Sequence, residues 1–236
     1  MDLASRLADV DARITDAAHA AGRDASSLTR IVVTKFHPTD LIRDLHALGV
    51  RDVGENRLQE LAGKVDAAHD LDGLRWHFIG QAQTNKVRLL AEVAARVPLT
   101  VHSLDRPRLV GALDRALHDA DGRPPAVPVD VLLQINLTDD AGRGGVAPAE
   151  LEQLAELAAA AASLRVRGVM AVAPLDEEAA PAFARLAGYA ERVRAVVPDA
   201  TWISAGMTGD FVEAIAAGAT HLRIGSAITG PRPVHD

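Results

Sequence analysis

The sequence predicts an α/β fold, and within that class a single (β/α)8 barrel of the TIM type with an extra N-terminal helix. Three observations predict it. Short apolar runs alternate with amphipathic helical patterns, the runs number eight, and 236 residues suffice for one such barrel. We therefore expect one domain over 1–236, with the N-terminal helix at 1–22 and the barrel at 30–232. Periodicity alone also allows an open doubly wound sheet.

The helix at the start of the chain carries apolar side chains at three- and four-residue steps and ends near Gly22. Strands are expected at the apolar runs 31–34, 51–53, 76–79, 99–102, 129–135, 166–171, 201–203 and 221–224. Helical patterns fill the intervals at 39–48, 57–69, 84–95, 106–120, 148–163, 178–196 and 209–217. Proline at helix starts and glycine at helix ends support these boundaries.

Composition limits the classes of function. Hydrophobic residues make up 48% of the chain but aromatic residues only 3%, so Ala, Val, Leu and Ile are expected to form the core. The net charge of −7 argues against a broad nucleic-acid surface, and no apolar stretch approaches the ~18 residues of a membrane span. The lack of cysteine excludes disulfides and thiolate chemistry. We expect a cytoplasmic protein that binds neither nucleic acid nor membranes.

Polar side chains at the carboxyl ends of the strands are candidate site residues, because the loops after the strands converge there. Lys35 directly follows the first run, and strand alternation aligns its side chain with Ile31 and Val33. If these residues face the barrel interior, the Lys35 amine is partly desolvated and available to form an imine. A lysine that emerges into solvent at the strand end is the alternative.

The segments after the seventh and eighth runs have the composition of a phosphate site. Ser204, Thr208 and Ser226 supply hydroxyls, and Gly206 and Gly225 let backbone N–H groups approach an anion closely. Turn formation and helix capping would explain either loop alone. Two such loops after the two expected strands favour a phosphate.

Arg223 lies between two apolar residues of the eighth run, so its guanidinium is expected to be buried. A buried guanidinium stays charged and needs a partner. Either an acidic side chain forms a structural ion pair with it, or a ring nitrogen of a ligand accepts its hydrogen bond.

Three histidines, His37, His77 and His102, are expected near the barrel mouth, but they lack the spacing of a zinc site. We therefore expect no metal. His77 is interpreted as a hydrogen-bonded histidine of the barrel.

Seven sequence motifs follow one another in order along nearly the whole chain. They are VVTKFHP at 32–38, DVGENRLQE at 52–60, WHFIGQAQTNK at 76–86, QIN at 134–136, RGVMA at 167–171, SAGMTGD at 204–210 and LRIGSAITGPR at 222–232. Together these motifs resemble the pyridoxal phosphate homeostasis protein family. The resemblance implies a barrel like the N-terminal domain of alanine racemase, with pyridoxal 5′-phosphate (PLP) held as a Schiff base on Lys35.

The resemblance also implies the roles of other residues. Asn56 would lie beside the cofactor, and Arg223 would face its pyridine nitrogen. The phosphate would be held by Ser204, Met207, Thr208, Gly225 and Ser226, with Gly206 in the same loop. The sequence departs from the family pattern at three places. Thr208 stands where serine is usual, and Gly209-Asp210 replaces a common acidic pair. Arg143 stands where a loop lysine is often found, which leaves Lys86 as the available second lysine.

The implied function is a non-catalytic one, in which the protein stores, buffers or delivers PLP within vitamin B6 homeostasis. PLP-dependent apo-enzymes are then possible partners. An arginine opposite the ring nitrogen leaves that nitrogen unprotonated, which makes the cofactor a weaker electron sink. Racemases of this barrel type resemble one another in a second domain and a Tyr or Cys acid/base, whereas Tyr189 is expected mid-helix here. Without that second domain we expect a monomer.

Two enzymatic alternatives stay open from the residues. One is a racemase-like PLP enzyme of the same barrel type. The other is a Schiff-base aldolase, which would also use a barrel lysine and a phosphate site. Visible absorption distinguishes a PLP Schiff base from an aldolase imine.

Overall fold

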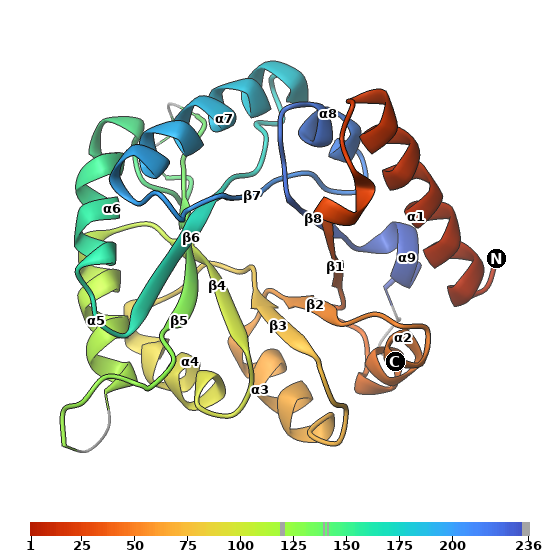
Figure 1. The fold of residues 1–236 in the computed structure, drawn as a ribbon. Helices are drawn as coiled ribbons and strands as arrows, with labels where there is room; N and C mark the ends of the chain where they lie inside the picture. The colour runs from red at the N-terminus through yellow and green to blue at the C-terminus, as the bar shows by residue number, and fades with distance from the viewer. Residues whose placement is uncertain (119–120, 139, 141, 233–236) are drawn as a thin grey trace.

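The computed structural model describes residues 1–118, 121–138, 140 and 142–232, and it confirms the predicted closed barrel of eight parallel strands (Figure 1). The strands are β1 (Thr29–Val33), β2 (Asp52–Glu55), β3 (Arg75–Phe78), β4 (Leu99–Leu104), β5 (Val129–Gln134), β6 (Leu164–Met170), β7 (Trp202–Ser204) and β8 (His221–Ile224). Each strand pairs with its sequence neighbour, and β1 pairs with β8 to close the ring. The open doubly wound sheet is therefore ruled out.

The helices cover the outside of the barrel. They are α1 (Leu3–Ala20), α2 (Thr39–Ala47), α3 (Leu58–Ala67), α4 (Val87–Ala94), α5 (Pro107–Leu117), α6 (Leu151–Ala159), α7 (Ala179–Val196), α8 (Phe211–Ala216) and α9 (Ser226–Thr229). Short 3₁₀ turns occupy Ala25–Ser27, Thr84–Lys86 and Pro148–Glu150. The helix predicted at 106–120 corresponds to α5, and residues 119–120 lie outside the described part, as do residues 233–236 of the predicted domain. Within the described residues, no helix is both long and apolar enough to cross a bilayer.

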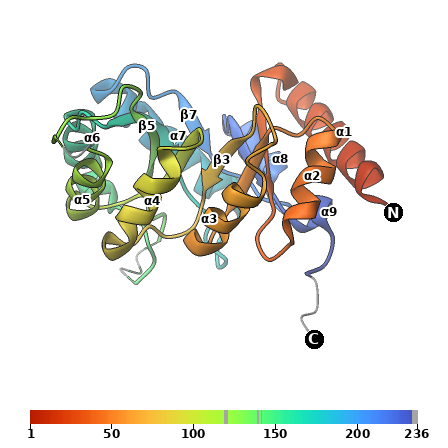
Figure 2. The same cartoon turned by 90° about the horizontal axis from the view of Figure 1, so that it is seen from below.

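The N-terminal helix α1 lies outside the ring against α8 and α9, on the opposite side of the barrel from α5 and α6 (Figures 1 and 2). Its buried face consists of Leu7, Val10, Ile14, Ala17 and Ala18. Arg6 Nε donates a hydrogen bond of 2.7 Å to the carbonyl oxygen of Ile228 in α9. The extra helix therefore supports the segment that follows β8.

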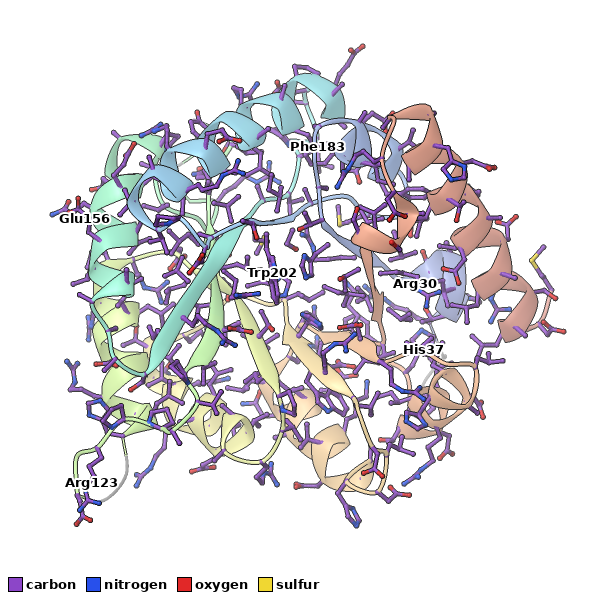
Figure 3. All side chains as sticks on the ribbon, viewed as in Figure 1. Arg30, His37, Arg123, Glu156, Phe183 and Trp202 are labelled. Carbon is purple, nitrogen blue, oxygen red and sulfur yellow. The ribbon has the colours of Figure 1, made fainter. Side chains whose placement is uncertain are left out.

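The main core lies between the strands and the helices, where alternate strand residues face outward. Figure 3 shows Phe183 of α7 directed toward the sheet and Glu156 of α6 directed away from it. The other strand face points into the barrel. An added Cβ at Gly54 would lie 3.0 Å from Ile31 Cγ2 and 3.7 Å from Val33 Cγ2, so these β1 residues face the interior.

The amino-terminal end of the barrel interior is polar. Asp52 receives hydrogen bonds from Arg75 Nε at 2.8 Å and pairs with His77 Nε2 at 3.0 Å. Burial alone would raise the pKa of Asp52, but the bonds from His77 and Arg75 outweigh it and lower the pKa from 3.8 to about 2. The Asp52 carboxylate therefore stabilises the folded state above its unfolded pKa, and this stabilisation is lost as the pH falls from about 4 to about 2.

We expect Asp52→Asn to lower the free energy of unfolding by about 2 kcal/mol at neutral pH, because Arg75 and His77 would no longer face a charged acceptor. The difference from the wild type should shrink as the pH falls below about 4 and vanish only below the folded-state pKa of about 2. Urea unfolding across this pH range measures it, with Asp9→Asn on the exposed face of α1 as the control. A difference that does not change with pH would contradict the assignment.

Candidate functional site

A cavity of about 410 Å³ opens at the carboxyl ends of β1, β7 and β8. It is lined by Val33, Lys35, Phe36, His37, Ile79, Met207, Thr208, Gly209, Arg223, Gly225, Ser226, Thr229, Gly230, Pro231 and Arg232. Six of the nine predicted site residues are among them: Lys35, Met207, Thr208, Arg223, Gly225 and Ser226. The register between β1 and β8, with Val32 opposite Ile224, places Lys35 and Ser226 at the same end of neighbouring strands.

Lys35 is half-buried two residues beyond the end of β1. Because Ile31 and Val33 face the barrel interior, alternation carries the Lys35 side chain to the same side, as expected from the sequence. Its Nζ lies 5.9 Å from the centroid of the Phe36 ring. Phe36 has φ of 69°, a left-handed conformation that turns the chain sharply away after Lys35.

A buried charge network holds this turn. Lys64 Nζ of α3 donates to Glu55 Oε1 at 2.7 Å, to Glu60 Oε1 at 2.7 Å and to the carbonyl oxygen of Thr34 at 2.9 Å. Thr34 Oγ1 donates to Glu55 at 2.6 Å, and the backbone N–H of Phe36 donates to Glu60 at 2.6 Å. The residues on both sides of Lys35 are therefore fixed by one ammonium group and its two carboxylates.

Lys35 is the only one of the chain's three lysines that lines this cavity. Lys64 is committed to Glu55 and Glu60. Lys86 lines a separate and smaller cavity of about 240 Å³. The half-buried Lys35 amine is thus the one available for chemistry at this site.

Arg223 is buried at the floor of the cavity, only 5% exposed. Its Nη1 donates to Ser204 Oγ at 2.7 Å and its Nη2 to the carbonyl oxygen of Ala171 at 2.9 Å. Burial lowers the pKa of Arg223 to about 10, partly offset by the charge of Asp210, so the group stays cationic at neutral pH. Both hydrogen-bond partners are neutral, so the structural ion pair that the sequence left open is not what holds Arg223.

Ser204 and Gly206 belong to the same region but do not line the cavity. Ser204 is completely buried beneath Arg223, and its hydroxyl is engaged there. Gly206 has φ of 89°, and a Cβ at this position would lie 2.8 Å from Ala214 Cβ. Gly206 therefore allows the loop to pack against α8, and its carbonyl oxygen accepts a 2.9 Å bond from Arg223 N.

The two loops face the cavity with hydroxyl and backbone groups. Among the described residues, the hydroxyls of Thr208 and Ser226 have no hydrogen-bond partner within the protein. The N–H of Met207 is already bound to Asp210 Oδ1 at 2.6 Å, so it is not available to a ligand. Arg232 adds a positive charge at the rim, where its guanidinium lies 4.0 Å from the Phe36 ring centroid. The arrangement suits an anionic group.

Asn56, Lys86 and Arg143 lie outside the Lys35 cavity. Asn56 and Lys86 line the smaller neighbouring cavity, and Asn56 Oδ1 is buried without a partner. Arg143 lines a third hollow with Asn136, whose Nδ2 donates to the Arg143 carbonyl oxygen at 3.3 Å. The structure thus separates these three from the residues around Lys35.

The structure separates the three histidines that were expected together near the barrel mouth. His37 lines the cavity, but His77 and His102 lie inside the barrel below it. The sequence ended the fourth strand at His102, whereas β4 continues to Leu104 and keeps His102 in the interior. The prediction that His77 is a hydrogen-bonded barrel histidine is confirmed. In the described part of the chain, no three His, Asp or Glu side chains are placed to hold a metal ion.

The cavity is also lined by four residues that the sequence did not predict as site residues: Phe36, Ile79, Thr229 and Arg232. Phe36 and Arg232 stand in motifs that were recognised, VVTKFHP and LRIGSAITGPR, but nothing in their spacing marks them. Thr229 and Arg232 belong to α9 and the residues after it, where the Arg232 guanidinium comes to lie over the Phe36 ring of the turn after β1.

Comparison with known proteins identifies the family. Residues 18–233 match the family model of the alanine racemase N-terminal domain. A pyridoxal phosphate homeostasis protein of Pseudomonas aeruginosa is 39% identical over 231 residues, covering 98% of this chain and 96% of that one. The chain belongs to the pyridoxal phosphate homeostasis protein family. The protein of the same name from Escherichia coli is 37% identical, with 98% and 97% of the two chains covered.

Solved structures agree with this assignment. PipY of Synechococcus elongatus, determined with PLP bound, is 32% identical and superposes with a TM-score of 0.80 over 97% of this chain and 100% of that chain. An alanine racemase of Corynebacterium glutamicum, 18% identical with a TM-score of 0.65, shares the fold and is covered over 61% of its length.

Proposed function

We propose that this protein binds PLP in the Lys35 cavity, with Lys35 as its Schiff-base lysine, and acts in PLP homeostasis without catalysing a reaction. One observation carries the proposal. A half-buried amine, a buried cationic guanidinium and two loops with free hydroxyls line the same cavity of about 410 Å³. The family assignment and the PLP-bound PipY structure support it.

The residues of the cavity fit the parts of the cofactor. Lys35 would supply the amine that holds the aldehyde carbon of the cofactor as a Schiff base. Arg223 is the cation at the floor that can donate to a ring nitrogen. Thr208 and Ser226, with the backbone of Gly209 and Gly225, would hold the phosphate. Asn56 and Ser204 do not line the cavity and would act through the residues that do. Met207 would contribute its side chain to the cavity wall.

The phosphate assignment predicts a selective loss of affinity. Ser226→Ala removes one hydroxyl that would donate to a charged oxygen, so PLP should bind about 10- to 100-fold more weakly. Pyridoxal, which lacks the phosphate, should bind the variant and the wild type equally well. Fluorescence or absorbance titration with both ligands measures the difference. Equal losses for PLP and pyridoxal would place Ser226 away from the phosphate.

A non-catalytic role is supported by what surrounds Lys35. Arg223, cationic at neutral pH, would leave a facing ring nitrogen unprotonated and weaken the electron sink that PLP supplies to enzymes. Tyr189 lies on α7 and lines the separate hollow with Arg143, with the Arg192 guanidinium 5.4 Å from its ring. No tyrosine of the chain therefore reaches the Lys35 amine as an acid or base.

The racemase-like alternative has a direct test. A racemase or transaminase would exchange the α-hydrogen of an amino acid with deuterium from solvent. We expect the PLP-loaded protein to show no more exchange than free PLP. Exchange well above that level would replace the homeostasis role with an enzymatic one.

The proposed function has three further parts. They are PLP-dependent apo-enzymes as recipients of the cofactor, a monomeric state and a cytoplasmic location.

A further inference from the structure

A chain of buried polar side chains runs through the barrel interior below Arg223. Ser204 Oγ lies 2.7 Å from Arg223 Nη1 and 3.0 Å from His102 Nδ1. His102 Nε2 lies 3.0 Å from His77 Nδ1, and His77 Nε2 lies 3.0 Å from Asp52 Oδ1. These five residues come from five different strands or strand ends, and each is at most 7% exposed. The chain joins the floor of the candidate site to the amino-terminal end of the barrel.

The chemistry of the two ends determines the direction of every hydrogen bond. With both rings neutral, the Asp52 carboxylate fixes the direction because it can only accept, so His77 carries its proton on Nε2 and is an acceptor at Nδ1. His102 then carries its proton on Nε2 and donates it to His77 Nδ1, which leaves His102 Nδ1 to accept the proton of the Ser204 hydroxyl. Arg223 can only donate, and Ser204 Oγ accepts from it. No other arrangement of neutral rings satisfies all four contacts.

The surroundings of His102 favour a neutral ring. Burial lowers the pKa of His102 well below its ordinary value. The Asp52 carboxylate stays ionised because His77 and Arg75 both donate to it. The chain therefore has a cation at one end, an anion at the other and two imidazoles between them.

We propose that His102 and His77 are positioning residues for the cofactor site, acting on Arg223 through Ser204. The bond from the Ser204 hydroxyl to His102 Nδ1 orients the hydroxyl, so that a lone pair of Ser204 Oγ faces Arg223 Nη1. With Nη1 held by Ser204 and Nη2 by Ala171, the guanidinium is fixed in one plane at the cavity floor. The consequence for the cofactor rests on the proposed function, whereas the direction of the chain does not.

The direction of the chain can be measured without any ligand. Nitrogen-15 NMR of the histidine rings at neutral pH should show His77 and His102 both neutral, both protonated on Nε2 and both unprotonated on Nδ1. A scalar coupling between His102 Nε2 and His77 Nδ1 should cross the hydrogen bond. An imidazolium form of either residue, or a proton on either Nδ1, would overturn the proposal even if the protein binds PLP.

The effect on the site is tested with two variants of His102. His102→Leu removes the acceptor of the Ser204 proton, so PLP affinity should fall about tenfold and the visible band should shift. His102→Gln keeps one acceptor and one donor and should restore both properties toward the wild type. If His102→Leu does not fold, Ser204→Ala breaks the chain with a smaller change and should show the same two effects.

The outcomes are distinct. Folded His102→Leu and Ser204→Ala proteins with wild-type affinity and spectrum would overturn the positioning role. Equal effects of His102→Leu and His102→Gln would show that packing, not the hydrogen-bond chain, is responsible, and would also overturn it. A wild-type protein that takes up no PLP would contradict the proposed function. The NMR measurement would still test the direction of the hydrogen-bond chain, because it needs no ligand.

Discussion

Lys35→Ala is expected to abolish the visible absorbance of the PLP-loaded protein and all labelling by borohydride. No other lysine lines the cavity, so no amine remains there to form the C=N bond. The barrel should stay folded, because the Lys35 side chain is half-buried and its nitrogen has no hydrogen-bond partner among the described residues. Absorbance spectra before and after reduction, together with circular dichroism, measure both effects.

Lys86→Ala is the matched control for this experiment. It removes a lysine that lines the smaller cavity and not the Lys35 cavity. We expect its spectrum and its labelling to equal those of the wild type. Full absorbance in Lys35→Ala, or loss of absorbance in Lys86→Ala, would show that the Schiff base does not form on Lys35 alone.

Lys64→Met is expected to destabilise the protein by about 3–5 kcal/mol, because it removes one partner of a buried ion pair and leaves the other uncompensated. Lys64 and Glu55 have side chains only 6% and 0% exposed, and Glu55 Oε2 already lacks a partner. The free energy of unfolding from urea denaturation measures the loss. The turn that carries Lys35 should also loosen, since Thr34 and Glu60 lose the same ammonium.

The loss should depend on pH in a defined direction. Burial raises the pKa of Glu55 in the wild type, and the charge of Lys64 acts against that increase. Without Lys64 the folded-state pKa rises further above the unfolded value. A group with a raised pKa contributes its stability below the unfolded pKa and loses it as the pH rises through the folded pKa. The destabilisation by Lys64→Met should therefore be small in acid and grow toward neutral pH.

The double variant Lys64→Met, Glu55→Leu is the control for this mechanism. Replacing both members of a buried pair with apolar residues leaves no uncompensated charge, so much of the lost stability should return. The double variant should also lose the pH dependence of the single variant. A double variant as unstable as Lys64→Met at every pH would show that packing around α3 is responsible.

The fold could be predicted from the sequence because its signal is local and repeated. Eight apolar runs at regular intervals gave the eight strands, although the ends were displaced by a few residues, as at β4. The short helix α9 was not predicted, because four residues after a strand carry no periodic pattern. Motifs at strand ends located Lys35, Arg223 and the two loops, since a parallel barrel brings all carboxyl ends together.

What could not be predicted are contacts between side chains on different strands. Lys64 reads as an ordinary exposed lysine of an amphipathic helix, yet it lies buried between Glu55 and Glu60. Ser204 was assigned to the phosphate loops by its position, but its hydroxyl is directed toward Arg223 inside the barrel. The direction of a strand-end side chain depends on where the strand stops, and a shift of one residue reverses it.

The covalent attachment of PLP to Lys35 is tested most directly by reducing the PLP-loaded wild-type protein with borohydride and mapping the labelled peptide. A modified Lys35 is no longer cut by trypsin, so the label should appear in the single peptide that spans residues 31–43. A label on Lys64, on Lys86 or on the amino terminus, or a protein that carries no label at all, would contradict the assignment of this cavity as the cofactor site.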